Sequence, residues 1–151
     1  MRLYFLRHGE ADWPNWEKPD DERPLTKAGE KEVHEVAGFL VRLKLRADLI
    51  ITSPLPRASQ TADIAAEHLK IRCQEEKMLA PGFRLEDLTR LLRKYPQEGL
   101  MLVGHEPDFT ETIKALTGGS VKLSKAGVAF VDLNLRKGKL LWLFPPKVAK
   151  R

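Results

Sequence analysis

The chain has 151 residues, of which 42% are hydrophobic and 31% are charged, and these are ordinary proportions for a globular protein. This length suffices for one domain with a buried core, so we expect a single domain over residues 1–151. No apolar run approaches the roughly 20 residues of a membrane-spanning helix, and a single cysteine, Cys73, excludes an internal disulfide bond.

The formal net charge of +5 raises the question of which anions the chain binds. Lys and Arg are scattered among Asp and Glu, apart from a short basic end at residues 147–151, whereas a nucleic-acid-binding protein concentrates them on one face or tail. We therefore expect no nucleic-acid partner and a modest positive field that suits an anionic substrate. The apolar stretch from Leu3 to Leu6 is too short for a secretion signal, so we expect a cytoplasmic protein without a membrane partner.

The first half of the chain alternates apolar runs with amphipathic stretches. Leu3 to Leu6 predicts a buried strand, and the polar, proline-containing segment 9–25 predicts a loop. Thr26 is suited to cap a helix whose apolar positions, from Val33 to Val41, form one stripe at helical spacing. A second predicted strand, at residues 48–52, is followed by Ser53-Pro54-Leu55-Pro56, which opens a helix running to about Leu69.

The second half continues the alternation. We expect a weaker strand at residues 71–75, a helix from Leu85 to Tyr95, a strand from Leu100 to Val103, and a helix that Pro107 opens and Gly118-Gly119 ends. Residues 128–135 and 139–144 predict a hairpin with Lys137-Gly138 at its turn. Alternating strands and helices indicate an α/β fold, a three-layer sandwich with a mainly parallel central sheet and helices on both faces.

Three unusual segments each follow a predicted strand. They are Arg7-His8-Gly9, Ser53-Pro54-Leu55-Pro56-Arg57 and Gly104-His105-Glu106-Pro107. Ligands of open α/β sheets bind at the carboxyl ends of the strands. If these strands are parallel neighbours, two arginines and two histidines converge on one crevice.

Such a cluster is suited to an anion. Arg57 and His105 lie where helices begin, and cations gathered at positive helix ends repel one another unless an anion lies among them. Adjacent guanidinium groups oppose a divalent cation, and the chain has neither a His-x-x-x-His motif nor a pair of cysteines, so we expect no metal. The chain also lacks the Cys-x-x-x-x-x-Arg loop of cysteine phosphatases and the Gly-x-x-x-x-Gly-Lys loop of ATPases. A neutral imidazole is a good nucleophile for phosphoryl transfer when a hydrogen bond fixes one of its nitrogens.

Four motifs in this order resemble the histidine phosphatase superfamily, whose fold is phosphoglycerate-mutase-like. They are Leu6-Arg7-His8-Gly9-Glu10, Arg23-Pro24-Leu25-Thr26-Lys27-Ala28-Gly29, the segment from Thr52 to Ala62, and Val103-Gly104-His105-Glu106-Pro107. Each motif alone is a weak signal, but their order and spacing agree with the family over nearly the whole chain. The short length and the Arg-Pro-Leu-Thr segment are most similar to the small phosphohistidine phosphatases.

The resemblance implies roles for individual residues. His8 would receive the phosphoryl group, Arg7 and Arg57 would hold its oxygens, and His105 would help to neutralise the charge at phosphorus. No organic cofactor or metal is implied. Arg23 is either a residue of the pocket mouth or an ordinary loop arginine.

Two departures from the family pattern matter. Many relatives carry an asparagine five residues after the glycine of Arg-His-Gly, whereas here Asn15 is six residues after Gly9, which puts its role in substrate binding in doubt. Larger relatives carry a carboxylic acid in an inserted region, and the matching stretch 78–82 has none. Other carboxyl groups that could serve as the acid are those of Glu10, Asp12, Glu75 and Glu76.

The missing acid bears on the substrate. A leaving alkoxide needs a proton donor, whereas imidazole, which titrates near pH 6.5, is less dependent on one. We therefore expect a phosphatase that acts on phosphohistidine in a phosphorylated protein partner. The alternatives are a phosphomonoesterase of sugar or nucleotide phosphates and a pseudoenzyme that binds phosphorylated proteins without turnover.

Overall fold

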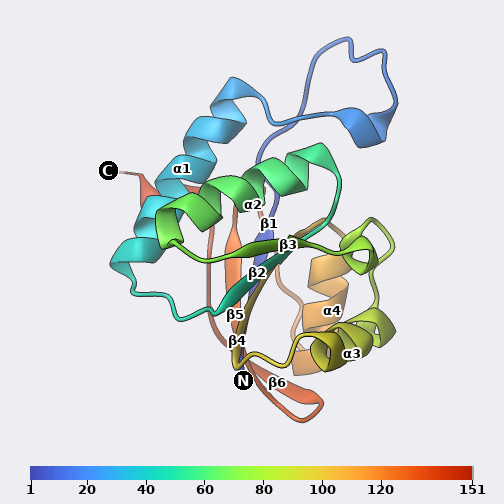
Figure 1. The fold of residues 1–151 in the computed structure, drawn as a ribbon, viewed down its shortest axis with the longest axis vertical. Coiled ribbons are helices and arrows are strands. Elements are labelled where there is room, and N and C mark those ends of the chain that lie inside the picture. Colours follow the sequence, from blue (N-terminus) through green and yellow to red (C-terminus); the bar gives the residue numbers. More distant parts are fainter. Residues whose placement is uncertain (151) are drawn as a thin grey trace.

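Six strands form one sheet in the order β3-β2-β4-β1-β5-β6, with helices on both faces (Figure 1). The structure, a computed structural model, describes residues 1–150. Its longer elements are β1 (Arg2–Arg7), α1 (Lys27–Arg42), β2 (Leu49–Thr52), α2 (Pro56–Leu69), β3 (Cys73–Glu75), α3 (Leu85–Lys94), β4 (Gly99–Gly104), α4 (Asp108–Thr117), β5 (Val128–Asn134) and β6 (Lys137–Phe144). Three short 3-10 helices complete the set: η1 (Asp20–Glu22), η2 (Lys77–Leu79) and η3 (Pro146–Ala149).

Parallel pairing brings the ends of three strands together. β3, β2, β4 and β1 run parallel, and only β5 and β6 are antiparallel to their neighbours. In this register Val103 of β4 lies between Leu6 of β1 and Thr52 of β2. The segments that follow these residues therefore leave the sheet at the same edge. The expected α/β sandwich with a mainly parallel sheet is confirmed.

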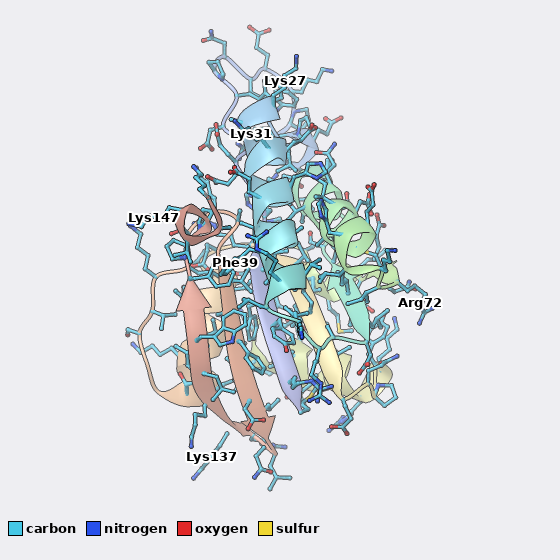
Figure 2. The ribbon with its side chains drawn as sticks, turned by 90° about the vertical axis from the view of Figure 1, so that its left-hand side faces the viewer. Lys27, Lys31, Phe39, Arg72, Lys137 and Lys147 are labelled. Atoms are coloured by element: carbon cyan, nitrogen blue, oxygen red, sulfur yellow. The ribbon has the colours of Figure 1, made fainter. Side chains whose placement is uncertain are left out.

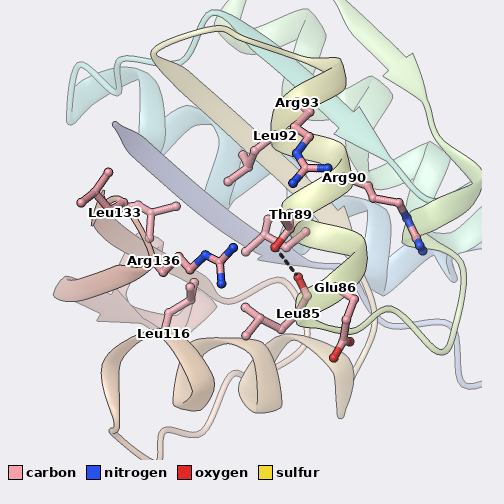
Figure 3. Close-up of a pocket in the computed structure, with 11 residues that line it drawn as sticks. Leu85, Glu86, Thr89, Arg90, Leu92, Arg93, Leu116, Leu133 and Arg136 are labelled. Carbon is pink, nitrogen blue, oxygen red and sulfur yellow. Dashed lines mark hydrogen bonds between the residues drawn. The ribbon is translucent and has the colours of Figure 1, made fainter.

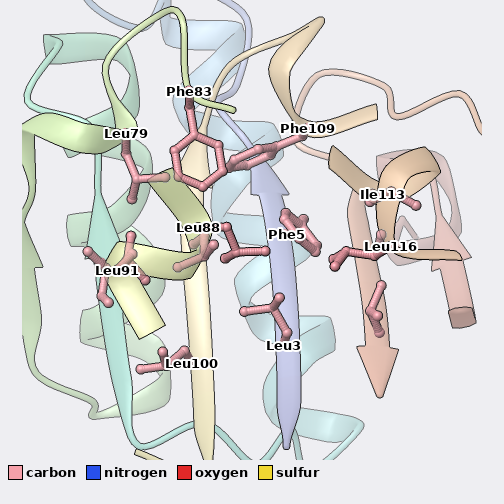
Figure 4. Close-up of a cluster of buried hydrophobic side chains, with 14 of the residues drawn as sticks. Leu3, Phe5, Leu79, Phe83, Leu88, Leu91, Leu100, Phe109, Ile113 and Leu116 are labelled. Atoms are coloured by element: carbon pink, nitrogen blue, oxygen red, sulfur yellow. The ribbon is translucent and has the colours of Figure 1, made fainter. Parts of the chain in front are cut away.

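Alternating side chains of β1 pack into the two layers of the core. Leu3 and Phe5 face α3 and α4, and Phe5 meets Phe109 edge to face with ring centroids 5.1 Å apart (Figure 4). Tyr4 and Leu6 belong to the layer under α1 and α2, which lie side by side over the opposite face (Figure 2). Full burial of a side chain such as Phe5 contributes about 1.5–3 kcal/mol. The central strand, which leads into His8, is thus held from both sides.

Most helix and strand predictions are confirmed. The Thr26 hydroxyl caps α1 by accepting a hydrogen bond from the amide of Gly29 at 3.0 Å. Val41 does not belong to the buried stripe, however. Val33, Val36, Ala37 and Leu40 are buried, and Val41 lies outside this face with 45% of its surface exposed. Within residues 1–150, no helix combines the length and the apolarity that a membrane crossing demands.

The predicted hairpin turn at Lys137-Gly138 was wrong. Lys137 and Gly138 pair with Asn134 and Leu133 within the sheet, and the turn consists of Leu135 and Arg136, with Leu135 at a φ of 58°. The glycine serves close packing instead of a turn, because a Cβ atom at Gly138 would lie 2.7 Å from a methyl group of Val131. β3 is also shorter than expected, since residues 71 and 72 precede it.

Gly29 fixes the first turn of α1 against the loop that follows His8, and its substitution should cost stability. A Cβ atom at Gly29 would lie 2.2 Å from the carbonyl oxygen of Glu10, so we expect Gly29→Ala to destabilise the fold by about 1–3 kcal/mol. Gly38, on the same helix, has only a side-chain nitrogen of Arg42 at 3.8 Å from the same position. Gly38→Ala should therefore stabilise the protein by about 0.5–1 kcal/mol. Urea denaturation of both variants measures these shifts, and equal stability of the two would contradict the close contact.

Candidate active site

Four of the residues predicted from the sequence lie together at the edge where β1, β2 and β4 end. Arg7 is the last residue of β1 and His8 follows it, Arg57 lies in the first turn of α2, and His105 follows β4. The rings of His8 and His105 have centroids 5.3 Å apart. His8, Arg57 and His105 are each at most 9% exposed.

The backbone around His8 selects one form of its imidazole. Nδ1 of His8 lies 2.7 Å from the carbonyl oxygen of Gly9. A carbonyl oxygen only accepts hydrogen bonds, so Nδ1 carries the proton and Nε2 presents a free lone pair. The amide of Gly9 in turn donates to the Thr61 hydroxyl at 3.1 Å, and that hydroxyl donates to the carbonyl oxygen of Arg57 at 2.7 Å. The segment that holds the His8 ring and the backbone of Arg57 are therefore joined by one hydrogen-bonded chain.

Ser53 contacts His105 directly. Its hydroxyl oxygen accepts a hydrogen bond from the amide of Leu55 at 3.2 Å and lies 2.8 Å from Nε2 of His105. When the hydroxyl donates its proton to Nε2, the proton of the imidazole lies on Nδ1. Nδ1 of His105 is then a buried donor.

Three buried nitrogens have no hydrogen-bond partner. Among the residues that the structure describes, the buried side-chain nitrogens without a partner are Arg7 Nε, Arg57 Nε and His105 Nδ1. Each such donor costs about 1–3 kcal/mol when it is left unpaired. Donors of this kind are suited to a group with several acceptor oxygens and negative charge, and a phosphoryl group has these properties.

Both histidines are neutral at physiological pH. Burial lowers the pKa of His8 to about 4, against the hydrogen bond to Gly9, and the positive charges of Arg57, Arg7 and Arg23 lower it further. Burial also lowers the pKa of His105 to about 3, with His8 and the two arginines acting in the same direction. A neutral His8 is a nucleophile, whereas a protonated one is not.

Arg23 is connected to Arg57 of this cluster by Asp20, which accepts hydrogen bonds from both arginines. Nε of Arg23 donates to Oδ1 of Asp20 at 2.8 Å, and NH1 of Arg57 donates to the backbone carbonyl of Asp20 at 3.1 Å. Arg23 also lies 3.6 Å from the carboxylate of Asp12. The positive charge of Arg23 lowers the pKa of both His8 and Arg57, and its role at the pocket mouth stays a prediction.

Asn15 does not join the cluster. It is exposed, adopts a left-handed backbone conformation with a φ of 56°, and makes no hydrogen bond to another residue of the described chain. Asparagine tolerates this conformation better than most residues, so its place is explained by the turn that it forms. Among residues 1–150 no hydrogen bond joins Asn15 to His8, Arg57 or His105, and its role in substrate binding stays a prediction.

Two of the four carboxyl groups considered as the acid are engaged in other interactions. The hydrogen bond from Lys125 holds the pKa of Asp12 below its ordinary value. Burial would raise the pKa of Glu76, but hydrogen bonds from Lys94 and Tyr95, at 2.8 and 2.9 Å, lower it overall. Neither group carries a proton to donate at neutral pH.

The other two candidate acids offer no better geometry. Glu10 contributes its backbone carbonyl to the start of α1, where it accepts from the amide of Thr26 at 3.0 Å. Glu75 is exposed at the end of β3, an outer strand of the sheet. Nothing in the described structure directs either side chain toward His8.

Sequence reasoning missed four residues of the site: Asp20, Ser53, Thr61 and Glu106. Ser53 and Thr61 lie in the family-like segment from Thr52 to Ala62, but the sequence does not show their hydrogen-bond partners. In the structure Ser53 contacts His105, and Thr61 accepts from the amide of Gly9. Glu106 accepts a hydrogen bond from the amide of Thr110 at 2.9 Å, and its burial raises the pKa of its carboxyl group. In the sequence, the position of Glu106 directly after His105 was the feature that could have marked it as a residue of the site.

A separate cavity of about 540 Å³ lies between α3 and the β5–β6 hairpin (Figure 3). Leucines form much of its wall, and the side chains of Arg93 and Arg136 extend into it. It contains neither a histidine nor a cysteine among its lining residues. The amide of Leu133, a residue that lines this cavity, donates a hydrogen bond to the carbonyl oxygen of Met1, just before β1 begins. His8 follows the opposite end of that strand. This cavity is therefore separate from the His8 cluster.

Comparisons with known proteins agree with this geometry. Residues 3–81 match the histidine phosphatase superfamily (branch 1). An uncharacterized protein of the cyanobacterium Picosynechococcus is 41% identical over 147 residues, which cover 91% of this chain and 86% of the relative. An uncharacterized phosphatase of Bacillus subtilis, PhoE, is 30% identical over 131 residues, which cover 81% of this chain and 64% of the relative.

Solved structures of similar fold include two proteins called SixA. The protein histidine phosphatase SixA complexed with tungstate has a TM-score of 0.89 at 23% identity, with 99% of this chain and 100% of that chain covered. The putative phosphohistidine phosphatase SixA from Agrobacterium tumefaciens has a TM-score of 0.83 at 26% identity, with 96% of this chain and 97% of that chain covered. Similarity at this level extends over the whole fold.

The protonation of the two histidines can be measured directly. Because their pKa values of about 4 and 3 lie below the ordinary 6.5, both rings should stay neutral as the pH falls from 8 to 5. Two-dimensional ¹H–¹⁵N spectra should show His8 protonated on Nδ1 alone throughout this range, with His8→Gln identifying its signals. Protonation of His8 near pH 6.5 in the free protein would contradict the described environment.

Proposed function

Because this chain belongs to the histidine phosphatase superfamily, we propose that it is a phosphatase that carries the phosphoryl group on His8 and takes it from phosphohistidine in a protein. The observation that carries this proposal is the hydrogen bond between His8 Nδ1 and the Gly9 carbonyl, which leaves Nε2 free beside three unpartnered donors. A nucleophile and a preorganised anion site are the two requirements of phosphoryl transfer.

The reaction has two steps. Nε2 of His8 attacks phosphorus, the bond from phosphorus to the leaving group breaks, and the leaving group keeps the electron pair. Water then attacks the phosphoryl group on His8, and the imidazole of His8 departs as a neutral ring. Its Nδ1 keeps its proton in both steps, because the Gly9 carbonyl accepts that proton's hydrogen bond throughout.

Charge neutralisation is assigned to the side chains of the cluster. Arg7, Arg57 and His105 would donate to the phosphoryl oxygens through the nitrogens that lack partners in the free protein. Residues 1–150 contain no group of three or more His, Cys, Asp or Glu side chains arranged to hold a metal ion. We therefore assign the electrostatic part of the mechanism to arginine and histidine.

The carboxyl groups support phosphohistidine as the substrate. Asp12 and Glu76 have lowered pKa values, so neither is a proton donor for a departing alkoxide at neutral pH. An imidazole leaving group departs without such a donor when its second nitrogen is already protonated. The name of the similar Agrobacterium protein, a putative phosphohistidine phosphatase, agrees with this substrate class.

One observation favours a second candidate function. Burial raises the pKa of Glu106, and this residue directly follows His105. If its carboxyl group donated a proton to the leaving group, the protein would be a phosphomonoesterase of small molecules such as sugar phosphates. The hydrogen bond from Thr110 to Glu106 argues against this role, because it ties the carboxylate to the start of α4.

Arg57 should not tolerate replacement by lysine. A lysine keeps the charge but loses the planar fork of donors, so kcat/KM for an aryl phosphate should fall by about 100-fold in Arg57→Lys. Arg72→Lys is the matched control, because Arg72 is exposed and makes no ion pair among the described residues. Steady-state kinetics and thermal melts of both variants measure the effect. Normal activity of Arg57→Lys would show that this arginine is structural.

Substrate preference should depend steeply on the leaving group. Removing a general acid typically lowers the rate by 10²–10⁴-fold, so kcat/KM should be high for a phosphohistidine peptide, intermediate for aryl phosphates and low for phosphoserine and sugar phosphates. The assays contain EDTA, which inhibits contaminating metal-dependent phosphatases. His8→Ala should be inactive in every assay.

Glu106→Gln separates the two candidate functions. A flat leaving-group profile in the wild type that becomes steep in Glu106→Gln would identify Glu106 as the acid and replace phosphohistidine by phosphate esters as the substrate. A steep profile in both proteins supports the phosphohistidine assignment.

A further inference from the structure

Asp20 makes an unexpected set of contacts for an exposed residue. Its side chain is 69% exposed, yet its carboxylate lies 3.6 Å from NH2 of Arg57, whose own side chain is only 7% exposed. The backbone carbonyl of Asp20 accepts from NH1 of the same guanidinium group at 3.1 Å. A negative charge thus lies beside an arginine of the proposed phosphoryl site.

The two oxygens of this carboxylate are not equally occupied. Oδ1 accepts a hydrogen bond from Nε of Arg23 at 2.8 Å. Oδ2 has only the 3.6 Å approach of Arg57, which is beyond hydrogen-bonding distance for a charged pair. Oδ2 is therefore free to accept a hydrogen bond at the mouth of the site.

Asp20 is held in this place by its surroundings. Within its loop, the indole nitrogen of Trp16 donates to the carbonyl oxygen of Pro19 at 3.1 Å, and that of Trp13 donates to the carbonyl oxygen of Pro24 at 2.8 Å. The hydrogen bonds from Arg23 and Arg57 fix the carboxylate and the backbone of Asp20 from two further directions. The folded loop and these two arginines thus hold the negative charge of the Asp20 carboxylate in one position.

A carboxylate at this position is unfavourable for an ordinary phosphate ester. A dianionic phosphoryl group bound at Arg57 would be repelled by a second negative charge on the same guanidinium group. The same repulsion acts on any phosphoryl dianion, but a substrate that brings a positive charge or an N–H donor to Oδ2 offsets it. Phosphohistidine has such a group, because the ring nitrogen that is not bound to phosphorus can carry a proton.

We propose that Asp20 selects phosphohistidine by accepting a hydrogen bond from the protonated second nitrogen of the substrate's imidazole. This inference rests on the proposed function and names the residue that distinguishes its substrate from phosphate esters. Nε of Arg57 is buried and unpartnered, so it is available to a phosphoryl oxygen, and the outer end of the same side chain lies against Asp20. The phosphoryl group and the leaving ring would then lie along one arginine.

The step is balanced without a general acid. The substrate enters with a positive imidazolium ring and a doubly negative phosphoryl group. Nε2 of His8 forms a bond to phosphorus, the bond between phosphorus and the substrate nitrogen breaks, and the electron pair stays on that nitrogen. The substrate ring leaves as neutral imidazole and keeps the proton that faced Asp20, while the ring of His8 becomes the positive one.

The neighbouring charges determine how far Asp20 favours the protonated ring. Arg57 on α2 and Arg23 in the same loop lie against its carboxylate and oppose protonation of the substrate. Asp12 is neutralised by Lys125 and lies 3.6 Å from Arg23, and Asp21 also acts on Arg57. Among residues 1–150, only Asp20 combines contact with Arg57 and a free carboxylate oxygen.

Replacing Asp20 by asparagine tests the assignment. Asp20→Asn keeps the shape and an acceptor for Arg23 but removes the charge. We expect kcat/KM for a phosphohistidine peptide to fall by roughly 10- to 100-fold, whereas kcat/KM for p-nitrophenyl phosphate rises, because the dianion no longer meets a negative charge. Asp21→Asn is the matched control, since it removes a carboxylate one residue away that makes no hydrogen bond or ion pair among residues 1–150. It should change the ratio of the two activities by less than about 2-fold.

The pH dependence of kcat gives a readout that a merely structural role would not alter. Asp20 favours the protonated form of the bound substrate and therefore raises the pKa of its imidazolium ring. Because kcat falls as this ring loses its proton, the alkaline limb for phosphohistidine should move to lower pH in Asp20→Asn. The profile for p-nitrophenyl phosphate contains no such group and should keep its alkaline limb.

The outcomes separate this inference from the proposed function. A wild-type enzyme that hydrolyses phosphoserine or sugar phosphates as well as phosphohistidine overturns the proposed function and the role of Asp20 with it. A wild-type preference for phosphohistidine that survives in Asp20→Asn overturns only the role of Asp20. An equal fall of both activities in Asp20→Asn also overturns it, because Asp20 would then merely position Arg57.

Discussion

The hydrogen bond from His8 Nδ1 to the carbonyl oxygen of Gly9 is the interaction on which the site depends. It assigns the proton of the ring to one nitrogen and thereby gives the other its lone pair. The segment that follows β1 lies so close to α1 that position 9 is suited to glycine. A Cβ atom at Gly9 would lie 2.6 Å from a methyl group of Val33, so α1 packs directly against this segment.

The low pKa values of the two histidines follow from the same close packing. Burial removes water from both rings and disfavours their charged forms, and the arginines add to the effect. A buried cluster of four positive groups would be highly unfavourable, whereas two arginines with two neutral rings are tolerated until an anion arrives. In the proposed function the site combines attraction for a phosphoryl group with an uncharged nucleophile, and these properties would conflict if His8 titrated at its ordinary pKa.

The order of elements and the convergence of the four central residues could be predicted from the sequence, because both depend on local signals. Apolar runs gave the strands, and a polar motif followed each of the three that form the site. The hairpin turn was misplaced because glycine is favoured both in turns and where backbones approach closely, and only the packing against Val131 distinguishes these causes at Gly138. Asp20 could not be assigned, since its partner Arg57 is 37 residues away in the chain and nothing local connects them.

The pairing of β1 has a consequence for how the protein is made. Both of its neighbours, β4 and β5, come from the last third of the chain, and β1 has no partner among the strands that directly follow it. During synthesis from the N-terminus, at about 5–20 residues per second, the strand that carries the nucleophile therefore emerges early and waits for nearly a hundred residues before Gly99–Gly104 can pair with it. Such long-range pairing is slow. Until it occurs the apolar strand stays open to association with other chains, and the nascent polypeptide has no phosphoryl site at all.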